Sequence, residues 1–203
     1  MIQYIQHRIN KTSELASVQK EYGVEIDLRS DVGHLHKLHL SHDAWVLGDD
    51  FDNWLLEFKA QCIFGPIILN TKEDGLEDII LQKLKNHKVE NEIIFLDTAF
   101  PTLIKNVQNG FGDHFFLRVS KFESTSWVHT FKNKIKWVWV DCFNGVPVPI
   151  PELKELSKCF KICLVSPELQ KQDVNYIDKF QEHLQYAHAV CSKRPDLWKA
   201  IEK

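Results

Sequence analysis

The sequence lacks several features that would place a chain of 203 residues in a specialised class. It contains no apolar run that approaches the ~20 residues of a membrane span, and the segment from Met1 to Arg8 lacks the apolar core of a signal peptide. The five cysteines are odd in number and follow no recognisable disulfide framework. We therefore expect free thiols in a reducing compartment, and a cytoplasmic protein with no membrane span.

A strong charge of either sign is also absent, since the net charge is -3 and charged residues make up 26% of the chain. No basic stripe suggests a nucleic-acid partner. A small anionic substrate would therefore have to be held by a few local cations. With 44% hydrophobic residues the chain can bury one sizeable core, so we expect a single domain over residues 1–203.

Eight short apolar runs alternate with stretches of helical periodicity, which is typical of a parallel sheet covered on both faces. Eight such units predict an α/β fold, a compact (βα)8 TIM barrel. An open doubly wound sheet is the alternative, but no glycine-rich phosphate loop follows the first run. A small hairpin insertion, residues 32–40, is expected after the second strand. The expected strands cover residues 4–9, 23–29, 66–71, 92–98, 115–120, 136–143, 161–166 and 188–193, with helices over 12–22, 50–60, 76–86 and 176–185, opening at Pro101, Thr125 and Pro151, and near Trp198.

Most of the expected strands end in a polar or charged residue. In a (βα)8 barrel the active site is built from these same strand ends, so their shared position predicts one site at the barrel mouth. The residues concerned are His7, Arg8, Glu25, Asp27, Arg29, His42, Asp43, Asn70, Lys72, Asp97, Arg118, Ser120, Asp141, Ser166, Ser192 and Lys193.

Glu25 and Asp27 flank Ile26 on the second expected strand. Residues two apart share a face of a strand, so both carboxylates point the same way. They would repel each other unless a cation neutralised them, and a hard divalent ion such as Mg²⁺ or Ca²⁺ suits oxygen ligands. The alternative is structural pairing with Arg29, Lys72 or Arg118.

Two histidines, His7 and His42, could supply one general base and one general acid near neutral pH. Each alone is more often a hydrogen-bonded structural group. The tract from His34 to His42 also carries His36 and His39; a transition-metal site is conceivable there, but we favour solvated hairpin residues for the first three.

Lys72, Arg8 and Arg118 are the cations that could clamp a phosphate. For each of them a salt bridge to Glu25, Asp97 or Asp141 is the competing interpretation. Trp139 shares a strand face with Asp141. If Asp141 faces the barrel mouth, Trp139 lies one layer deeper and either lines the pocket or, as we favour, fills core space.

In order, the segments IQHR, GVEIDLR, LSHD and ILNTKEDG resemble the glycerophosphodiester phosphodiesterase family, within the phosphatidylinositol-phospholipase-C-like superfamily. The motif match covers residues 7–72, and the likeness is closest to a short bacterial subgroup. The resemblance implies a metal-binding phosphoric diester hydrolase of lipid metabolism, acting on a glycerophosphodiester or a related lipid- or glycan-linked phosphodiester. It implies an acid–base pair of His7 and His42, phosphate contacts from Arg8 and Lys72, and Mg²⁺ or Ca²⁺ on Glu25 and Asp27.

The sequence departs from the family pattern in three places. Ile9 replaces a glycine after the HR pair, the following loop lacks the usual ENT motif, and Asn70 replaces the third metal carboxylate. Two alternatives therefore stay open: a catalytically impaired or repurposed barrel that binds a phosphorylated ligand, and a lyase that forms a cyclic phosphate without metal.

Overall fold

The computed structural model describes residues 1–31, 33–34 and 36–202. Val32 and Leu35, within the predicted hairpin, lie outside the described residues. The chain divides into two compact units. We call His7–Lys105 the N-terminal unit, and Met1–Gln6 together with Asn106–Lys203 the C-terminal unit.

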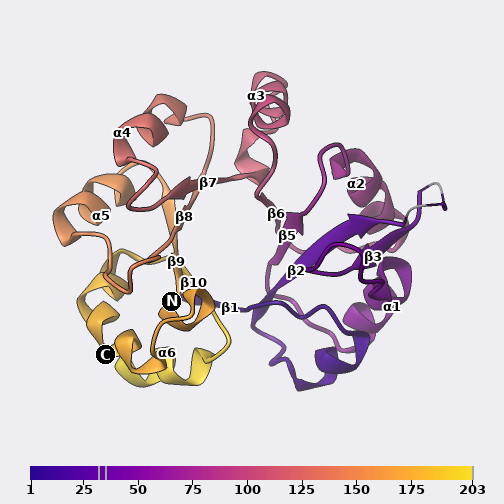
Figure 1. The fold of residues 1–203 in the computed structure, drawn as a ribbon, viewed down its shortest axis with the longest axis horizontal. Coiled ribbons are helices and arrows are strands. Elements are labelled where there is room, and N and C mark those ends of the chain that lie inside the picture. The colour runs from indigo at the N-terminus through magenta and orange to yellow at the C-terminus, as the bar shows by residue number, and fades with distance from the viewer. Residues whose placement is uncertain (32, 35, 203) are drawn as a thin grey trace. The chain divides into compact units, whose positions relative to one another are not determined.

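The N-terminal unit contains a mixed sheet (Figure 1, indigo to magenta). Strand β2 (Gly23–Ser30) pairs in parallel with β5 (Ile67–Thr71), and β5 pairs in parallel with β6 (Ile93–Leu96). On the other side of β2, β3 (Leu38–Leu40) and β4 (Asp49–Asp50) add antiparallel strands. The register sets Asp27 opposite Asn70, which brings two predicted site residues together.

Helix α1 (Phe51–Ala60) shows why this unit folds as it does. Asp50 caps it by accepting a hydrogen bond from the Asn53 backbone N–H at 3.0 Å. Its apolar residues recur at helical spacing and form one fully buried face: Phe51, Trp54, Leu55 and Phe58. The other helices of this unit are η1 (Thr12–Ser17), α2 (Glu77–Asn86) and the first part of α3 (Phe100–Gln108).

The C-terminal unit is built on a parallel sheet with the strand order β1-β10-β9-β8-β7. Figure 1 shows α4, α5 and α6 flanking these strands. The strands are β1 (Gln3–Gln6), β7 (Phe116–Val119), β8 (Trp137–Val140), β9 (Lys161–Val165) and β10 (Ala189–Ser192). The helices are η2 (Gly112–His114), α4 (Thr125–Val128), η3 (His129–Phe131), α5 (Ile150–Ser157), η4 (Pro167–Gln170), η5 (Val174–Tyr186) and α6 (Pro195–Ile201).

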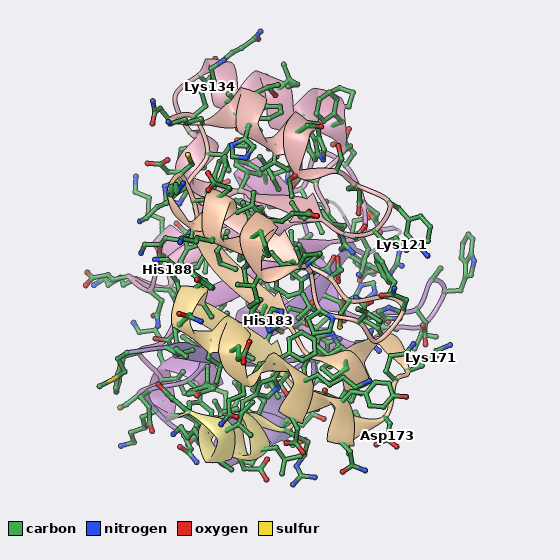
Figure 2. All side chains as sticks on the ribbon, turned by 90° about the vertical axis from the view of Figure 1, so that its left-hand side faces the viewer. Lys121, Lys134, Lys171, Asp173, His183 and His188 are labelled. Atoms are coloured by element: carbon green, nitrogen blue, oxygen red, sulfur yellow. The ribbon has the colours of Figure 1, made fainter. Side chains whose placement is uncertain are left out.

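Two of the expected helices are 3₁₀-helices. Helix η5 buries Ile177, Phe180, His183 and Leu184, a spacing that fits an α-helix as well as the three residues per turn of a 3₁₀-helix. Figure 2 labels His183 on this helix and Asp173 at its N-terminal end, where the Asp173 carboxylate accepts a hydrogen bond from the Asn175 N–H. Helix η1 replaces the expected helix over 12–22 and ends early, because Val18 has an extended backbone.

The predicted α/β class is confirmed, and each expected parallel strand has a counterpart within a few residues. Three expectations stay predictions. They are that the strands close into a complete barrel, that the hairpin is an insertion, and that the chain forms a single domain. Among the described residues, none of the helices combines the length and apolar character needed to cross a bilayer.

Candidate functional site

The site is centred on two buried carboxylates of β2. Glu25 and Asp27 are each only 1% exposed. Ile26 between them is completely buried, and strand alternation turns its side chain to the opposite face. Burying two like charges is costly without partners, so the groups around them decide what the pair can do.

Asp27 is surrounded by cationic and amide groups. The ammonium of Lys72 lies 2.9 Å from Oδ1, and Nε of Arg8 lies 3.4 Å from Oδ2. Asn10 makes two hydrogen bonds to Asp27: its Nδ2 donates to Oδ2 at 2.7 Å, and its Oδ1 accepts from the Asp27 backbone N–H at 2.9 Å. These contacts hold the carboxylate in one orientation and neutralise its charge.

Glu25 has weaker compensation. Its Oε2 accepts a hydrogen bond from the Arg8 backbone N–H at 2.9 Å and lies 3.6 Å from Nε2 of His7. Its Oε1 accepts from the amide of Asn70 at 3.1 Å. Burial, and then the neighbouring charge of Asp27, raise the pKa of Glu25 from 4.5 to about 7. A cation at this carboxylate would therefore be favourable near neutral pH.

The turn after β1 positions His7 and Arg8. Arg8 adopts a left-handed backbone with φ 60°, which is uncommon outside glycine and asparagine. Ile9 then fixes the segment: its N–H donates to the Glu25 carbonyl at 2.9 Å, and its carbonyl accepts from the indole of Trp54 at 3.0 Å. Hydrogen bonds of the Ile9 backbone to the β2 backbone and to the Trp54 indole of α1 thus help to place both predicted side chains beside the carboxylates.

His42 follows β3 and is held by groups of the same sheet. Its Nδ1 lies 2.7 Å from Oδ1 of Asp43, and its carbonyl accepts from Arg29 at 3.1 Å. The hydrogen bond and charge of His42 lower the pKa of Asp43. A carboxylate on Nδ1 orients the ring and leaves Nε2 as the nitrogen that can exchange a proton with a ligand.

A cavity of about 340 Å³ brings part of the site together within the N-terminal unit. Arg8, Asn10 and His42 all line it. A predicted phosphate-binding arginine and a predicted acid–base histidine therefore face one cavity.

Other predicted residues lie elsewhere or have structural partners. Arg118 donates to Asp141 at 2.7 Å within the C-terminal unit, which is the salt bridge that competed with a phosphate role. Trp139 is buried and packs edge-to-face on Phe116 at 5.3 Å. Asp97 follows β6 in a left-handed conformation and is exposed. Roles in the site for Arg118, Asp141, Trp139 and Asp97 stay predictions.

Sequence reasoning missed Asn10 and Glu168. Asn10 organises Asp27, but a lone asparagine three residues after His7 carries no recognisable signal. Glu168 lies in the segment VSPELQ, where no chemistry was predicted, and its Oε1 accepts from Ser192 Oγ at 2.6 Å and from the Lys193 N–H at 3.0 Å. This carboxylate ties the end of β10 to η4, which is a structural role.

The donor set fits a hard divalent cation in its chemistry. Glu25, Asp27 and Asn70 offer oxygen atoms, and the buried Oδ1 of Asn70 has no hydrogen-bond partner among the described residues. Oxygen ligands are what Mg²⁺ and Ca²⁺ prefer. With two carboxylates only, the described residues hold no group of three histidine, cysteine, aspartate or glutamate side chains that could bind a metal.

The chain thus combines an α/β fold with two cationic side chains, Lys72 and Arg8, beside a buried carboxylate. No family model and no curated protein matches the sequence. Solved structures do match. A phosphodiesterase from Oleispira antarctica, in complex with the product sn-glycerol-3-phosphate, has a TM-score of 0.72 at 13% identity, covering 98% of this chain and 96% of that one.

Two further structures agree. A protein from Agrobacterium tumefaciens assigned as a glycerophosphoryl diester phosphodiesterase has a TM-score of 0.73 at 10% identity, covering 99% of this chain and 97% of that one. One from Galdieria sulphuraria assigned as a glycerophosphodiester phosphodiesterase has a TM-score of 0.73 at 10% identity, covering 100% and 98%. The chain therefore has the fold of these phosphodiesterases, as the motif resemblance predicted.

Proposed function

We propose that the protein is a metal-assisted phosphoric diester hydrolase that acts on a glycerophosphodiester or a related lipid- or glycan-linked phosphodiester. The observation that carries this is the buried pair Glu25 and Asp27 with Lys72 and Arg8 on it, next to a cavity lined by His42. The shared fold supports it, as does the glycerol phosphate in the Oleispira structure.

Cleavage of a phosphodiester needs a base for the attacking hydroxyl and an acid for the leaving alcohol. His42 and His7 fill these roles in the proposal. Asp43 fixes His42 through Nδ1, so Nε2 takes or gives the proton, and Glu25 lies beside Nε2 of His7. The attacking hydroxyl belongs to the substrate or to water.

Charge on the non-bridging phosphate oxygens must also be neutralised as the bond breaks. Arg8 and Lys72 supply two cations at Asp27, and a phosphate oxygen can share them with that carboxylate. Arg118 is the third predicted phosphate ligand. Glu25, Asp27 and Asn70 would hold Mg²⁺ or Ca²⁺, which supplies further positive charge to the phosphate when bound.

The proposal extends to the fold and to the other supporting residues. Residues 1–203 would form a single-domain (βα)8 barrel. Arg29, Asp97, Asp141 and Trp139 would then support the mouth of that barrel.

The test is turnover of a glycerophosphodiester and of an aryl phosphodiester by the purified protein with Mg²⁺ or Ca²⁺. We expect His7→Ala and His42→Ala each to lower kcat by roughly 10²–10⁴-fold, the usual contribution of general acid–base catalysis. His34→Ala is the matched control, because its side chain is 70% exposed and pairs with Asp31.

Full activity in either site variant would overturn the acid–base assignment. Full activity in the presence of a chelator would contradict the proposed metal dependence. A cyclic phosphate as the final product would make the protein a lyase. Binding of sn-glycerol-3-phosphate without turnover of any diester would instead make it a repurposed barrel.

A further inference from the structure

Beyond His42 and Asp43 the chain presents an apolar loop, which we define as residues Ala44, Trp45, Val46 and Leu47. Trp45 is 99% exposed and Leu47 is 73% exposed. Single exposed apolar residues are ordinary, but a contiguous apolar patch usually marks a binding site. This one begins two residues after a predicted acid–base histidine.

The loop is held in place by its backbone. Trp45 has a left-handed conformation with φ 66°, which is a genuine outlier for a bulky side chain and is maintained only where the surroundings impose it. At one end Ser41 Oγ donates to the Asp43 carbonyl at 3.0 Å. At the other, a Cβ on Gly48 would collide with the Leu40 carbonyl oxygen, so only glycine lets the loop return this close to β3. The apolar side chains are therefore presented outward by an anchored loop.

Two cavities of the N-terminal unit meet at this loop. One is the cavity of about 340 Å³ that Arg8 and His42 line, and the other measures about 440 Å³ and has Arg29 in its wall. Val46 and Leu47 line both of them. An apolar surface is thus continuous with the place where the proposed function puts the phosphate.

We propose that the apolar loop is the subsite for an apolar alkyl group on the alcohol of the phosphodiester, so that the substrate class is amphiphilic. This rests on the proposed function. Arg8 lines the same cavity as Val46 and Leu47. An alkyl chain on a phosphate held there by Arg8 would therefore reach these side chains and remove them from water.

The charged residues that flank the loop along the chain are acidic, which favours a single amphiphilic molecule over a membrane surface. Asp43 precedes the loop, and Asp49 and Asp50 follow Gly48. Segments that bind the anionic surface of a bilayer carry lysine and arginine, which these acidic residues would oppose.

The test compares two esters of glycerol phosphate, one with methanol and one with octanol, both below the micelle concentration. We expect wild type to prefer the octyl diester by roughly 10-fold or more in kcat/KM, mainly through a lower KM, because each buried methylene adds binding energy. Leu47→Ser and Trp45→Ser should reduce this preference severalfold. Phe64→Ser is the matched control: Phe64 is 68% exposed in the same unit and lines neither cavity.

Octyl phosphate titrated into the protein by calorimetry gives a readout independent of turnover, and Leu47→Ser should weaken its binding relative to methyl phosphate.

Cleavage of the methyl diester with no octyl preference, or a preference that survives Leu47→Ser, would overturn the subsite and leave the proposed function intact. Cleavage of neither diester would refute the proposed function itself, and the subsite with it. Loss of binding to neutral phosphatidylcholine vesicles in Trp45→Ser, with an unchanged octyl preference, would assign the loop to a membrane surface and overturn the subsite.

Discussion

At the scale of single residues, Asn70 matters most for the cation that we propose at Glu25 and Asp27. Its amide nitrogen donates to Glu25, while its buried Oδ1 has no hydrogen-bond partner among the described residues. An amide oxygen can ligate a cation but adds no charge. In the proposed site, the negative charge that would attract a metal comes from Glu25 and Asp27, and Lys72 and Arg8 already compensate part of it.

Asn70→Glu should raise the affinity for Mg²⁺ or Ca²⁺ by about 10-fold or more, because a third carboxylate strengthens the Coulomb attraction in a buried site. Without metal the same substitution should lower the Tm, since it adds a like charge next to Glu25. Calorimetric titration and thermal melts with and without cation measure both effects. Asn53→Glu adds the same charge at an exposed position of α1 and should change neither; equal cation affinity in Asn70→Glu and wild type would exclude Asn70 as a ligand.

His188 should make the fold sensitive to mild acid. Its Nδ1 accepts a hydrogen bond from the Ile162 N–H at 3.2 Å. The residue is exposed overall, but partial desolvation of the ring, followed by the charge of Lys161, lowers its pKa from the usual 6.5, so the expected effect on stability is small. Above pH 6.5 the imidazole is neutral both folded and unfolded. Below it the unfolded chain takes up the proton first, so the free energy of unfolding falls with pH until the folded pKa is reached.

Urea unfolding at a series of pH values between 6.5 and ~5 measures this dependence. His188→Asn should flatten the slope, and His183 should account for part of the remainder, because burial lowers its pKa as well. Both histidines, which Figure 2 labels, belong to the C-terminal unit. The exposed His34→Asn should keep the wild-type slope, and a wild-type slope in His188→Asn would contradict the assignment.

At the scale of elements, α1 supports the site through one hydrogen bond. The indole of Trp54 donates to the carbonyl of Ile9, in the turn that presents His7 and Arg8. Trp54→Phe keeps an aromatic ring but leaves that buried carbonyl unpaired, so we expect a loss of about 1–3 kcal/mol in the free energy of unfolding. Urea denaturation measures it.

Leu56→Ala on the exposed face of the same helix is the control and should stay within about 0.5 kcal/mol of wild type. A Trp54→Phe variant as stable as that control would mean that the Ile9 carbonyl finds another donor. The turn would then not depend on α1.

Comparison of the expected and observed elements shows how far hydrophobic periodicity predicts secondary structure. The apolar runs located each parallel strand, because burial on both faces leaves a continuous apolar signal. The buried residues of η5, which are Ile177, Phe180, His183 and Leu184, have a spacing that occurs on α-helices and does not reveal a 3₁₀-helix. Helix type was therefore less predictable than helix position.

At the scale of the whole molecule, the expectation of a single domain predicts one cooperative unfolding transition. Hydrogen exchange measured by mass spectrometry along a urea series follows peptides of both compact units, His7–Lys105 and the rest of the chain. The hydrogen exchange that requires global unfolding should have the same urea midpoint in both units. Two separated midpoints would show that the units unfold as separate domains.

The sequence by itself determined the alternation of strands and helices and the polar character of the strand ends, because both follow from local side-chain periodicity and burial. It also determined that Glu25 and Asp27 share a face, since alternation on a strand leaves no other choice. Only the tertiary structure decided the partners. Lys72 pairs with Asp27 and not with Glu25, Arg118 pairs with Asp141, and Asn10 braces Asp27. Such contacts join segments far apart in the chain, so they depend on strand register and on the path of each connecting turn, which no local pattern encodes.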